Sequence, residues 1–416
     1  MILHIDCNSF YAACEMARHP ELKGKPVIVG NHNEVGGGVI LALTKEAKQL
    51  GLKRGVPMFQ SKKVIDSNEV KVFPADLTRY GEVSRQIMKT VTNSELLKDF
   101  HQYSIDEFFG TVSIKNKNDL HEFGMLIKNI IYEKTSIPVS CGISLTYTLA
   151  KTATWYAKKF EGYHGVCVLM EENLEKALKR IPIASVWGVG YRSAPKMKQM
   201  QIATAWDFTQ KNKMFILNCF RVSGLRTWME LKGTPAINLH EHATQRTVMH
   251  SRTFTHMTSD HEQMQNYVCN YAVAAARKLR RQHSICRSVT VFANTNRHRE
   301  DLQQYSNGFT VHLSHATADT TTIVKAAYQA LNAIFQPYYL YKRAGVMLSD
   351  IMSDEAIEQD LFTPMTKSLK KSVRLMHTTD MINQKYGTNK IKLASQVVQT
   401  KKENTDWKPE RTTRQI

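Results

Sequence analysis

The sequence has 416 residues, which is too long for one ordinary domain and predicts two to four domains with substantial cores. Its formal net charge of +19 favours a polyanionic partner, which on charge alone could be nucleic acid, an anionic membrane or the ribosome. Seven cysteines without a C-x-x-C pair match neither a disulfide framework nor a zinc site, and we find neither a secretory leader nor a membrane-spanning stretch, so we expect a cytoplasmic protein without membrane contact.

The first 168 residues predict a sheet flanked by helices. The opening MILHID is typical of a buried strand, and FYAACEMARHPELKG predicts a helix that ends at a glycine. KPVIVG predicts a strand, and VGGGVILALTKEAKQLGLKRGVP predicts a Gly-rich turn followed by an amphipathic helix that ends near Gly51 and Pro57. Farther along, VSRQIMKTVTNSELL and TLAKTATWYAKKF predict helices, whereas FHQYSIDEFFGTVSI and IPVSCGISLT predict strands.

The rest of the chain predicts a helical module and a second α+β domain. Short helices are expected from Glu171 to about Gly233, interrupted by VWGVGYRSAPKMKQM, and LKGTPAINLHEHATQ is the candidate linker. The segments that follow predict the order β-α-β-β-α-β. From Ser353 onward the chain has few apolar anchors and many basic residues, so we expect partial disorder there.

Three acidic residues lie in apolar surroundings, Asp6 at the end of the first strand and Asp106 with Glu107 inside YSIDEFF. Carboxylates in such places are costly unless paired or metal-bound, and three that converge would suit Mg²⁺. Adjacent residues of a flat strand face opposite ways, so Asp106 and Glu107 can share a site only at a turn, and we predict a hairpin there. The alternative is that Asp6 caps a helix and the other two lie in a solvated turn.

Five segments in order give the sequence a family resemblance. IDCNSFYAACE, ALTKEAKQLGLKRGVP, YSIDEFFG, CGISLTYTLAKTATWYAKK and VWGVG are similar in order and spacing to those of the UmuC/DinB-like Y-family translesion DNA polymerases. The strong motifs cover residues 1 to 240, and Asn8, where many DinB-like members have an acid, indicates the UmuC branch. By this resemblance, Asp6, Asp106 and Glu107 are catalytic and hold two Mg²⁺ ions with the backbone carbonyl of Cys7.

The resemblance also implies the architecture, an α+β multi-domain right-hand polymerase. Its expected parts are a ferredoxin-like palm (1–12 and 78–168), small fingers (13–77), a helical thumb with a helix-hairpin-helix (169–235), a linker (236–245), a β-α-β-β-α-β little finger (246–352), and a clamp-binding-like segment with a basic, partly disordered tail (353–416). Small, open fingers imply low fidelity, because a pocket that does not close tightly rejects misshapen pairs poorly.

Five residues are expected to bind the incoming deoxynucleoside triphosphate. Tyr11 matches the family's steric gate, a ring that occupies the space of a ribose 2′-hydroxyl, and Phe10 is expected to shape the same pocket; both rings could also be plain core packing. Lys45 and Lys48, three apart on one predicted helical face, and Lys158 match triphosphate contacts. The family commonly has Tyr and Arg at the first two of these lysine positions, so an aromatic hydroxyl and a bidentate fork are lost here.

Other residues are expected to hold primer-template DNA and a clamp. Gly188 and Gly190 in VWGVG would let backbone N–H groups approach a phosphate, although a tight interhelical turn also explains them. In the little finger a basic cluster at a helix end is expected to grip DNA, although such clusters are usually solvated surface; its members are Arg277, Lys278, Arg280 and Arg281. Leu361 and Phe362, in IEQDLF, resemble a sliding-clamp-binding peptide, with simple packing as the alternative.

The sequence therefore predicts a template-directed, low-fidelity DNA polymerase for translesion synthesis and damage-induced (SOS) mutagenesis, which an accessory mutagenesis subunit could assist. Two alternatives remain open. A catalytically silent DNA- and clamp-binding regulator would keep the same fold, and Lys45 in place of Tyr leaves room for it. A metal-dependent nuclease would share the two-ion chemistry, but Tyr11 and the triphosphate lysines favour a nucleotide pocket.

Overall fold

The computed structural model describes residues 1–31, 38–239, 245–354, 367–387 and 390–396. The chain divides into two compact units, Met1–Glu241 and His242–Ile416. Among the described residues, no helix combines the length and the apolar character needed to cross a membrane.

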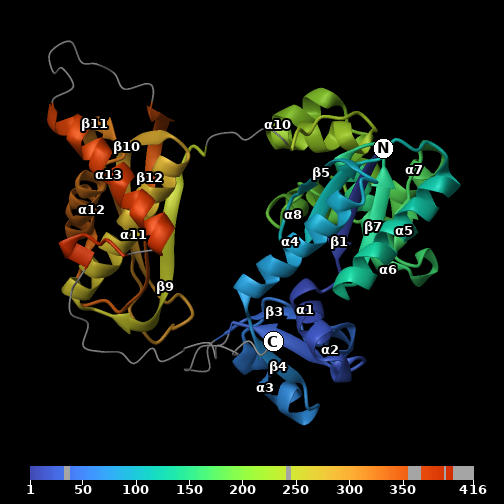
Figure 1. Ribbon diagram of the computed structural model, residues 1–416, viewed down its shortest axis with the longest axis horizontal. Coiled ribbons are helices and arrows are strands. Elements are labelled where there is room, and N and C mark those ends of the chain that lie inside the picture. The colour runs from blue at the N-terminus through green and yellow to red at the C-terminus, as the bar shows by residue number, and fades with distance from the viewer. Residues whose placement is uncertain (32–37, 240–244, 355–366, 388–389, 397–416) are drawn as a thin grey trace. The chain divides into compact units, whose positions relative to one another are not determined.

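A five-stranded sheet forms the centre of the first unit, in the order β5-β6-β1-β7-β8 (Figure 1). Its strands are β1 (Ile2–Cys7), β5 (Lys98–Gln102), β6 (Glu107–Thr111), β7 (Val139–Ser144) and β8 (Val166–Val168). All neighbouring pairs are antiparallel except β7 and β8, which are parallel. The apolar opening of the chain therefore forms the buried central strand that its sequence predicts.

Helices cover both faces of this sheet. They are α1 (Phe10–Arg18), α4 (Leu77–Asn93), α5 (Lys117–Thr135) and α6 (Tyr147–Lys159). Leu3 and Ile5 of β1 pack in one core with residues of α4 and α5, whereas His4 contacts Thr154 of α6 on the opposite face. Because strand side chains alternate, Asp6 lies on the α6 face with His4.

A smaller sheet with the order β3-β2-β4 packs beside helix α1. Its elements are β2 (Val27–Gly30), β3 (Ile40–Leu43), α2 (Lys45–Gln49), α3 (Met58–Ser67) and β4 (Lys71–Pro74). The sequence interpretation of a Gly-rich turn running directly into one amphipathic helix was wrong here, because residues 40–43 form a strand that pairs with β2. Thr44 ends that strand and caps α2 by accepting a hydrogen bond from the Ala47 N–H, so the helix is short.

Short helices complete the first unit, as the sequence predicts for this stretch. They are α7 (Glu171–Arg180), α8 (Ser193–Gln199), α9 (Ala205–Thr209) and α10 (Lys213–Leu231), with 3-10 turns at Pro20–Leu22, Glu161–Tyr163 and Ile183–Ser185. Helix α10 is kinked at Arg221, whose φ of 59° and ψ of −163° are not helical. The buried Glu230 near its end accepts hydrogen bonds from the backbone of Thr148, Ala236 and Ile237, which fixes α10 against the start of α6.

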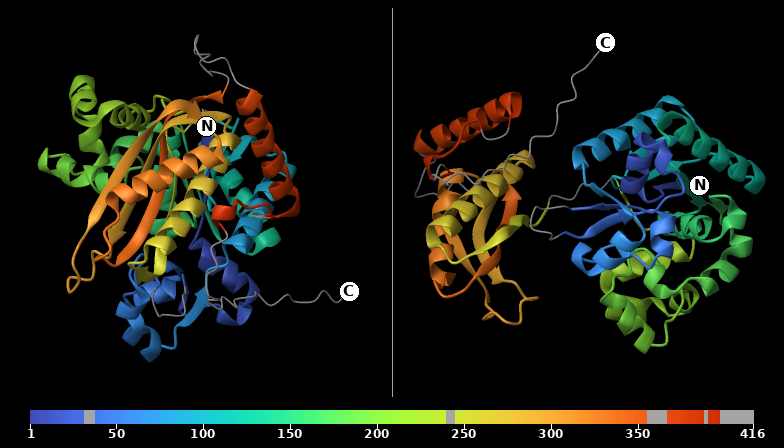
Figure 2. Two further views of the ribbon diagram at one scale, coloured as in Figure 1. Left: turned by 90° about the vertical axis from the view of Figure 1, so that its left-hand side faces the viewer. Right: turned by 90° about the horizontal axis from the view of Figure 1, so that it is seen from below.

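The second unit contains the predicted β-α-β-β-α-β order. Its elements are β9 (Val248–Thr258), α11 (His261–Arg281), β10 (Ser284–Thr295), β11 (Ser306–Thr317), α12 (Thr320–Ile334) and β12 (Tyr341–Ser353). The sheet is antiparallel with the order β11-β10-β12-β9, and Figure 2 shows α11 and α12 side by side over it. The apolar faces of both helices and the sheet share one core.

The basic tail contains a further helix, α13 (Lys367–Tyr386), followed by a 3-10 turn at Ala394–Gln396. Partial disorder from Ser353 onward stays a prediction, and the part of the tail that the structure describes lies against the helical layer of the second unit (Figure 2). Met376 and Asn383 are buried, and Leu393 packs on the core. The apolar anchors of the tail are few, as the sequence indicates. Hydrogen bonds and ion pairs, which could not be recognised in the sequence, supplement them.

Candidate active site

The three predicted carboxylates come from two neighbouring strands. Asp6 of β1 is in register with Glu107 of β6, and the Cys7 N–H donates a 2.9 Å hydrogen bond to the Asp106 carbonyl. Strands β5 and β6 form the predicted hairpin, in which the N–H groups of Tyr103 and Ser104 both donate to the Glu107 carbonyl at 3.0 Å. Asp106 lies in the turn, and Glu107 begins β6. In a regular strand the two side chains would point to opposite faces of the sheet, and the turn removes this constraint.

Two lysines of α6 reach these carboxylates. Lys158 forms an ion pair with Asp6, and the Lys151 ammonium lies 2.9 Å from Glu107 Oε1. Residues seven apart on a helix lie on nearly the same face, so both ammonium groups point to one edge of the sheet. Lys158 was predicted as a triphosphate contact, whereas Lys151 was missed, although its spacing from Lys158 was a usable signal.

Burial controls the electrostatics of the site. Burial raises the pKa of Asp6, the Lys158 ammonium opposes this effect, and the Glu107 and Asp106 carboxylates reinforce it. Below them, burial and the charges of Lys151 and Lys158 hold the pKa of His4 well below its usual value, so its imidazole is neutral. The site is thus a cluster of acids with two compensating lysines.

The donor chemistry of this cluster suits a hard divalent cation, because all its side-chain ligands are carboxylate oxygens. The strand register of Asp6 with Glu107, and the hydrogen bond from the Cys7 N–H to the Asp106 carbonyl, bring the three residues close together. In the described residues, no three His, Cys, Asp or Glu side chains stand in positions that would hold a metal, and two of the three acids are paired with lysines. A cation would therefore replace lysine contacts, and the residues fit it by composition and proximity.

The predicted nucleotide residues surround the start of α1. Phe10 is buried, and the Tyr11 ring stacks on Tyr80 with centroids 4.5 Å apart and an interplanar angle of 17°. The Tyr80 hydroxyl donates a 2.7 Å hydrogen bond to the buried Glu15, which holds the ring beneath Tyr11. Tyr11 is therefore supported by another ring and is half-buried.

The lysines of α2 have different neighbours. Lys48 Nζ donates to Ser9 Oγ at 3.2 Å, directly before α1. Lys45 Nζ lies 2.7 Å from Glu161 Oε1, and both side chains are largely exposed. The structure thus brings Lys48 near the Phe10 and Tyr11 segment, while Lys45 is engaged by a surface carboxylate.

The VWGVG turn differs at its two glycines. Gly188 has a φ of +88°, and a Cβ there would lie 2.5 Å from Thr227 Oγ1 of α10, whereas a Cβ at Gly190 would meet nothing within 4 Å. Packing therefore requires only Gly188 to be glycine. Gly190 is open to an approaching molecule.

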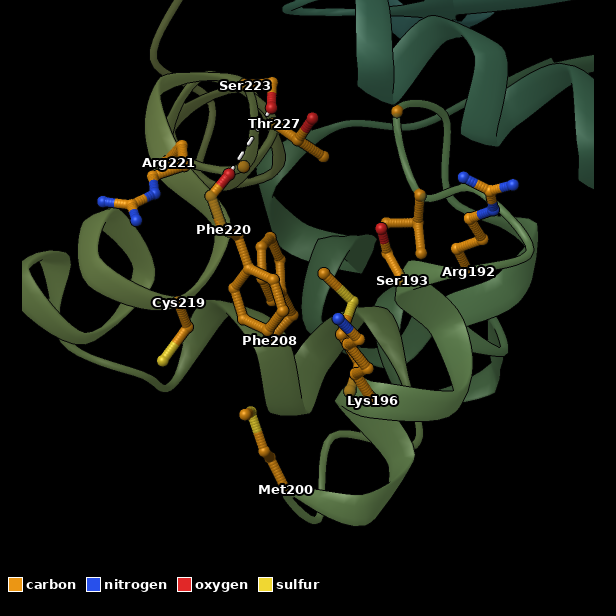
Figure 3. A pocket seen from close by; sticks show the side chains of 14 residues that line it. Arg192, Ser193, Lys196, Met200, Phe208, Cys219, Phe220, Arg221, Ser223 and Thr227 are labelled. Carbon is orange, nitrogen blue, oxygen red and sulfur yellow. Dashed lines mark hydrogen bonds between the residues drawn. The ribbon is translucent and has the colours of Figure 1, made fainter. Parts of the chain in front are cut away.

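Beside this turn is a pocket of about 240 Å³ between α8, α9 and α10 (Figure 3). Phe208 and Phe220 meet edge to face inside it, and Arg192 and Lys196 lie on the α8 side. Arg221, at the kink of α10, lies on the opposite side (Figure 3). Basic side chains thus flank the turn that was predicted to contact phosphate.

The predicted DNA-gripping cluster of the second unit is divided by its contacts. Arg280 donates to both carboxylate oxygens of Asp380 at 2.6 and 3.0 Å and to the Ala318 carbonyl at 2.7 Å, and Arg277 lies 3.9 Å from the same carboxylate. Both arginine side chains are mostly buried against α13. The DNA-contact prediction for these two stays a prediction, and in this structure their guanidinium groups are engaged by Asp380, with a further contact from Arg280 to Ala318.

Two other members of that cluster remain candidates for DNA contact. Lys278 and Arg281 are both exposed, and Lys278 Nζ lies 3.4 Å from the Met249 carbonyl. Leu361 and Phe362, the predicted clamp-binding pair, lie outside the described residues.

Comparison with known proteins identifies the family of this chain independently of the site's geometry. Residues 5–155 match the impB/mucB/samB family model, residues 245–361 match its C-terminal domain, and residues 373–414 match a domain of unknown function (DUF4113). Protein UmuC of Salmonella typhimurium is 35% identical over 395 residues, which are 94% of this chain and 92% of that protein. MucB of Escherichia coli is 35% identical, with 95% and 93% covered, and DNA polymerase IV of Oceanobacillus iheyensis is 26% identical, with 94% and 90% covered.

Solved structures show a similar fold. A Y-family DNA polymerase chimera, Dbh-Dpo4(243-245)-Dbh, aligns with a TM-score of 0.65 at 22% identity, over 85% of this chain and 99% of that one. The insertion ternary complex of Dbh DNA polymerase aligns with a TM-score of 0.54 at 22% identity and the same coverage.

Proposed function

The chain belongs to the impB/mucB/samB family and is a DNA-directed DNA polymerase of the Y family, and we propose that it adds deoxynucleotides opposite damaged template bases with two Mg²⁺ ions. The observation that carries the proposal is the cluster of Asp6, Asp106 and Glu107 beside two lysines at one edge of the central sheet. Low fidelity and damage-induced mutagenesis are part of the proposal and are expected from the family.

The carboxylates of Asp6 and Asp106 would hold the metal with the Cys7 carbonyl, and Glu107 would complete the site near the primer 3′-hydroxyl. Bound in pairs, such ions lower the pKa of the attacking hydroxyl and stabilise the leaving oxygen. Lys158 balances the charge of Asp6 in this structure, and its ammonium would contact the triphosphate when a metal takes over that balance. Lys48 adds a second positive charge on the same side, whereas Lys45 must first leave Glu161.

Tyr11 selects deoxynucleotides in this proposal. Its ring stacks on Tyr80, which Glu15 holds by a hydrogen bond, so the ring cannot easily move away from an added 2′-hydroxyl. Phe10, buried behind it, shapes the same wall. The selectivity is then steric and depends on a supported aromatic ring.

Primer-template DNA would be held by backbone N–H groups at Gly188 and Gly190 and by basic side chains of the second unit, of which Lys278 and Arg281 remain candidates. Such contacts bind duplex DNA without reading its sequence. A sliding clamp, through Leu361 and Phe362, and an accessory mutagenesis subunit remain expectations from the family.

Primer extension on a DNA template containing one abasic site, compared with an undamaged template, tests the proposal. Extension that requires the template, a divalent cation and deoxynucleotides, and that continues past the lesion, is the expected result. DNA binding by folded protein without any extension would favour the silent regulator. Degradation of the primer without nucleotides would favour a nuclease.

A further inference from the structure

Lys151 is enclosed by aromatic rings as well as paired with Glu107. Its ammonium lies 4.7 Å from the ring centroid of Tyr103 and 5.1 Å from that of Trp187. A third ring, Phe109, is 5.8 Å away. The Lys151 side chain is only 15% exposed, so both the ion pair and the cation–π contacts operate with little competition from water.

The three rings of this cage also contact one another. Trp187 meets Tyr103 edge to face at 5.6 Å and lies 6.2 Å from Phe109. Tyr103 and Phe109 belong to the hairpin that carries Glu107, whereas Trp187 directly precedes Gly188. The cage therefore joins the catalytic hairpin to the turn that we expect to contact DNA.

Glu107 is otherwise loosely held on this side. Its Oε1 accepts from Lys151 at 2.9 Å, and His4 Nε2 lies 3.8 Å away, beyond hydrogen-bonding distance. The position of the carboxylate thus depends on an ammonium whose own position is set by three rings. Enclosure by the rings restricts a long, flexible lysine side chain and so helps it to hold the carboxylate in place.

We propose that Lys151 is a positioning residue that fixes one oxygen of Glu107 so that the other faces the metal site, and that Trp187 couples this position to the DNA-contacting turn. The inference rests on the polymerase function proposed above. Because Trp187 closes the cage, a displacement of the turn by DNA changes the enclosure of the Lys151 ammonium and with it the orientation of Glu107. Any such coupling between DNA and metal is reciprocal.

Lys151→Met tests the positioning role, because methionine fills the aromatic cage but carries no charge. Two quantities are measured, Mn²⁺ affinity of the DNA-free protein and single-nucleotide incorporation. Loss of a nearby positive charge should tighten Mn²⁺ binding by about threefold or more. Loss of orientation should lower kcat by roughly tenfold to a hundredfold with little change in KM.

Two variants serve as controls. Lys151→Arg keeps the charge and stacks on aromatic rings, so it should restore native Mn²⁺ affinity and much of kcat. Lys159→Gln removes a neighbouring lysine of α6 whose ammonium lies 4.5 Å from the Trp155 ring, away from the carboxylates, and should change neither quantity. Thermal unfolding of each variant identifies loss of folding.

A double-mutant cycle tests the coupling. Trp187→Leu should shift Mn²⁺ affinity and kcat in the same directions as Lys151→Met but less, and the double variant should show less than the product of the two effects. Fully multiplicative effects would overturn the coupling. Trp187→Phe, which keeps a ring, should resemble the native protein.

Three outcomes would overturn the positioning role. The first is a Lys151→Met variant with unchanged kcat and unchanged Mn²⁺ affinity. The second is tighter Mn²⁺ binding with unchanged kcat. The third is weaker Mn²⁺ binding with a lowered melting temperature, which would indicate that Lys151 has an ordinary packing role. If the native protein fails to extend primers, the proposed function falls, but the Mn²⁺ measurements and their cycle still decide whether Lys151 and Trp187 act on Glu107.

Discussion

The two glycines of the VWGVG turn should separate folding from DNA contact. Gly188→Ala places a side chain at a φ of +88°, which costs about 1–2 kcal/mol, and forces its Cβ to 2.5 Å from Thr227 Oγ1, for which overpacking of about 1–3 kcal/mol is usual. The total of roughly 2–5 kcal/mol corresponds to a melting temperature about 4–20 °C lower for a unit of this size.

Gly190→Ala is the matched control, because its Cβ would lie in open space. It should change stability by less than about 0.5 kcal/mol. If the turn's backbone approaches a phosphate, however, the added methyl group should weaken binding to primer-template DNA. The assay is thermal unfolding followed by circular dichroism, with DNA affinity measured by fluorescence anisotropy at fixed salt.

A Gly188→Ala variant with the same melting temperature as the native protein would show that the close contact with Thr227 does not exist. Native DNA affinity for a stably folded Gly190→Ala would separately remove the predicted phosphate contact. The opposite pattern, an unstable Gly190→Ala variant, would show that the turn is packed differently.

Three further predictions concern other parts of the molecule. Tyr11→Ala should let the protein incorporate ribonucleotides in a single-nucleotide assay, and unchanged preference for deoxynucleotides would show that another group excludes the 2′-hydroxyl. Lys158→Ala should move the acidic limb of Mn²⁺ affinity to higher pH, because the lysine lowers the pKa of Asp6; an unmoved limb, measured by titration from pH 5 to 8, would contradict this. Asp380→Asn should weaken the anchor that Arg280 provides for α13 by about 3 kcal/mol or less, because the ion pair is partly exposed. Amide hydrogens of residues 374–386 should therefore exchange faster with solvent. Native exchange rates would contradict the anchoring role.

Local signals in the sequence were sufficient for much of the architecture. The apolar run before Asp6 predicted the central strand, and the need for Asp106 and Glu107 to share a site predicted the hairpin that the structure contains. The order of elements in the second α+β unit was predicted because its segments alternate between strand-like and helix-like hydrophobic patterns. In these cases neighbouring residues determine the outcome, so one sequence is enough.

Other features depend on contacts between distant residues. Strand β3 forms because β2 lies beside it, and Arg280 appears in the sequence as a solvated charge until Asp380, a hundred residues later, is placed against it. The spacing of Lys151 from Lys158 places both lysines on one helical face, but the aromatic cage around Lys151 could not be predicted, since Tyr103 and Trp187 come from separate parts of the chain. Such pairings are decided by tertiary packing.

The most direct test of the central claim is primer extension by Asp106→Asn and Glu107→Gln, with DNA binding measured on the same samples. The control is Glu172→Gln, which removes a surface carboxylate paired with Lys117 on the exposed side of α7. We predict that each active-site variant loses extension by at least about a hundredfold while binding DNA as the native protein does, and that the control extends normally. Near-native extension by either active-site variant would contradict the assignment of these carboxylates to catalysis.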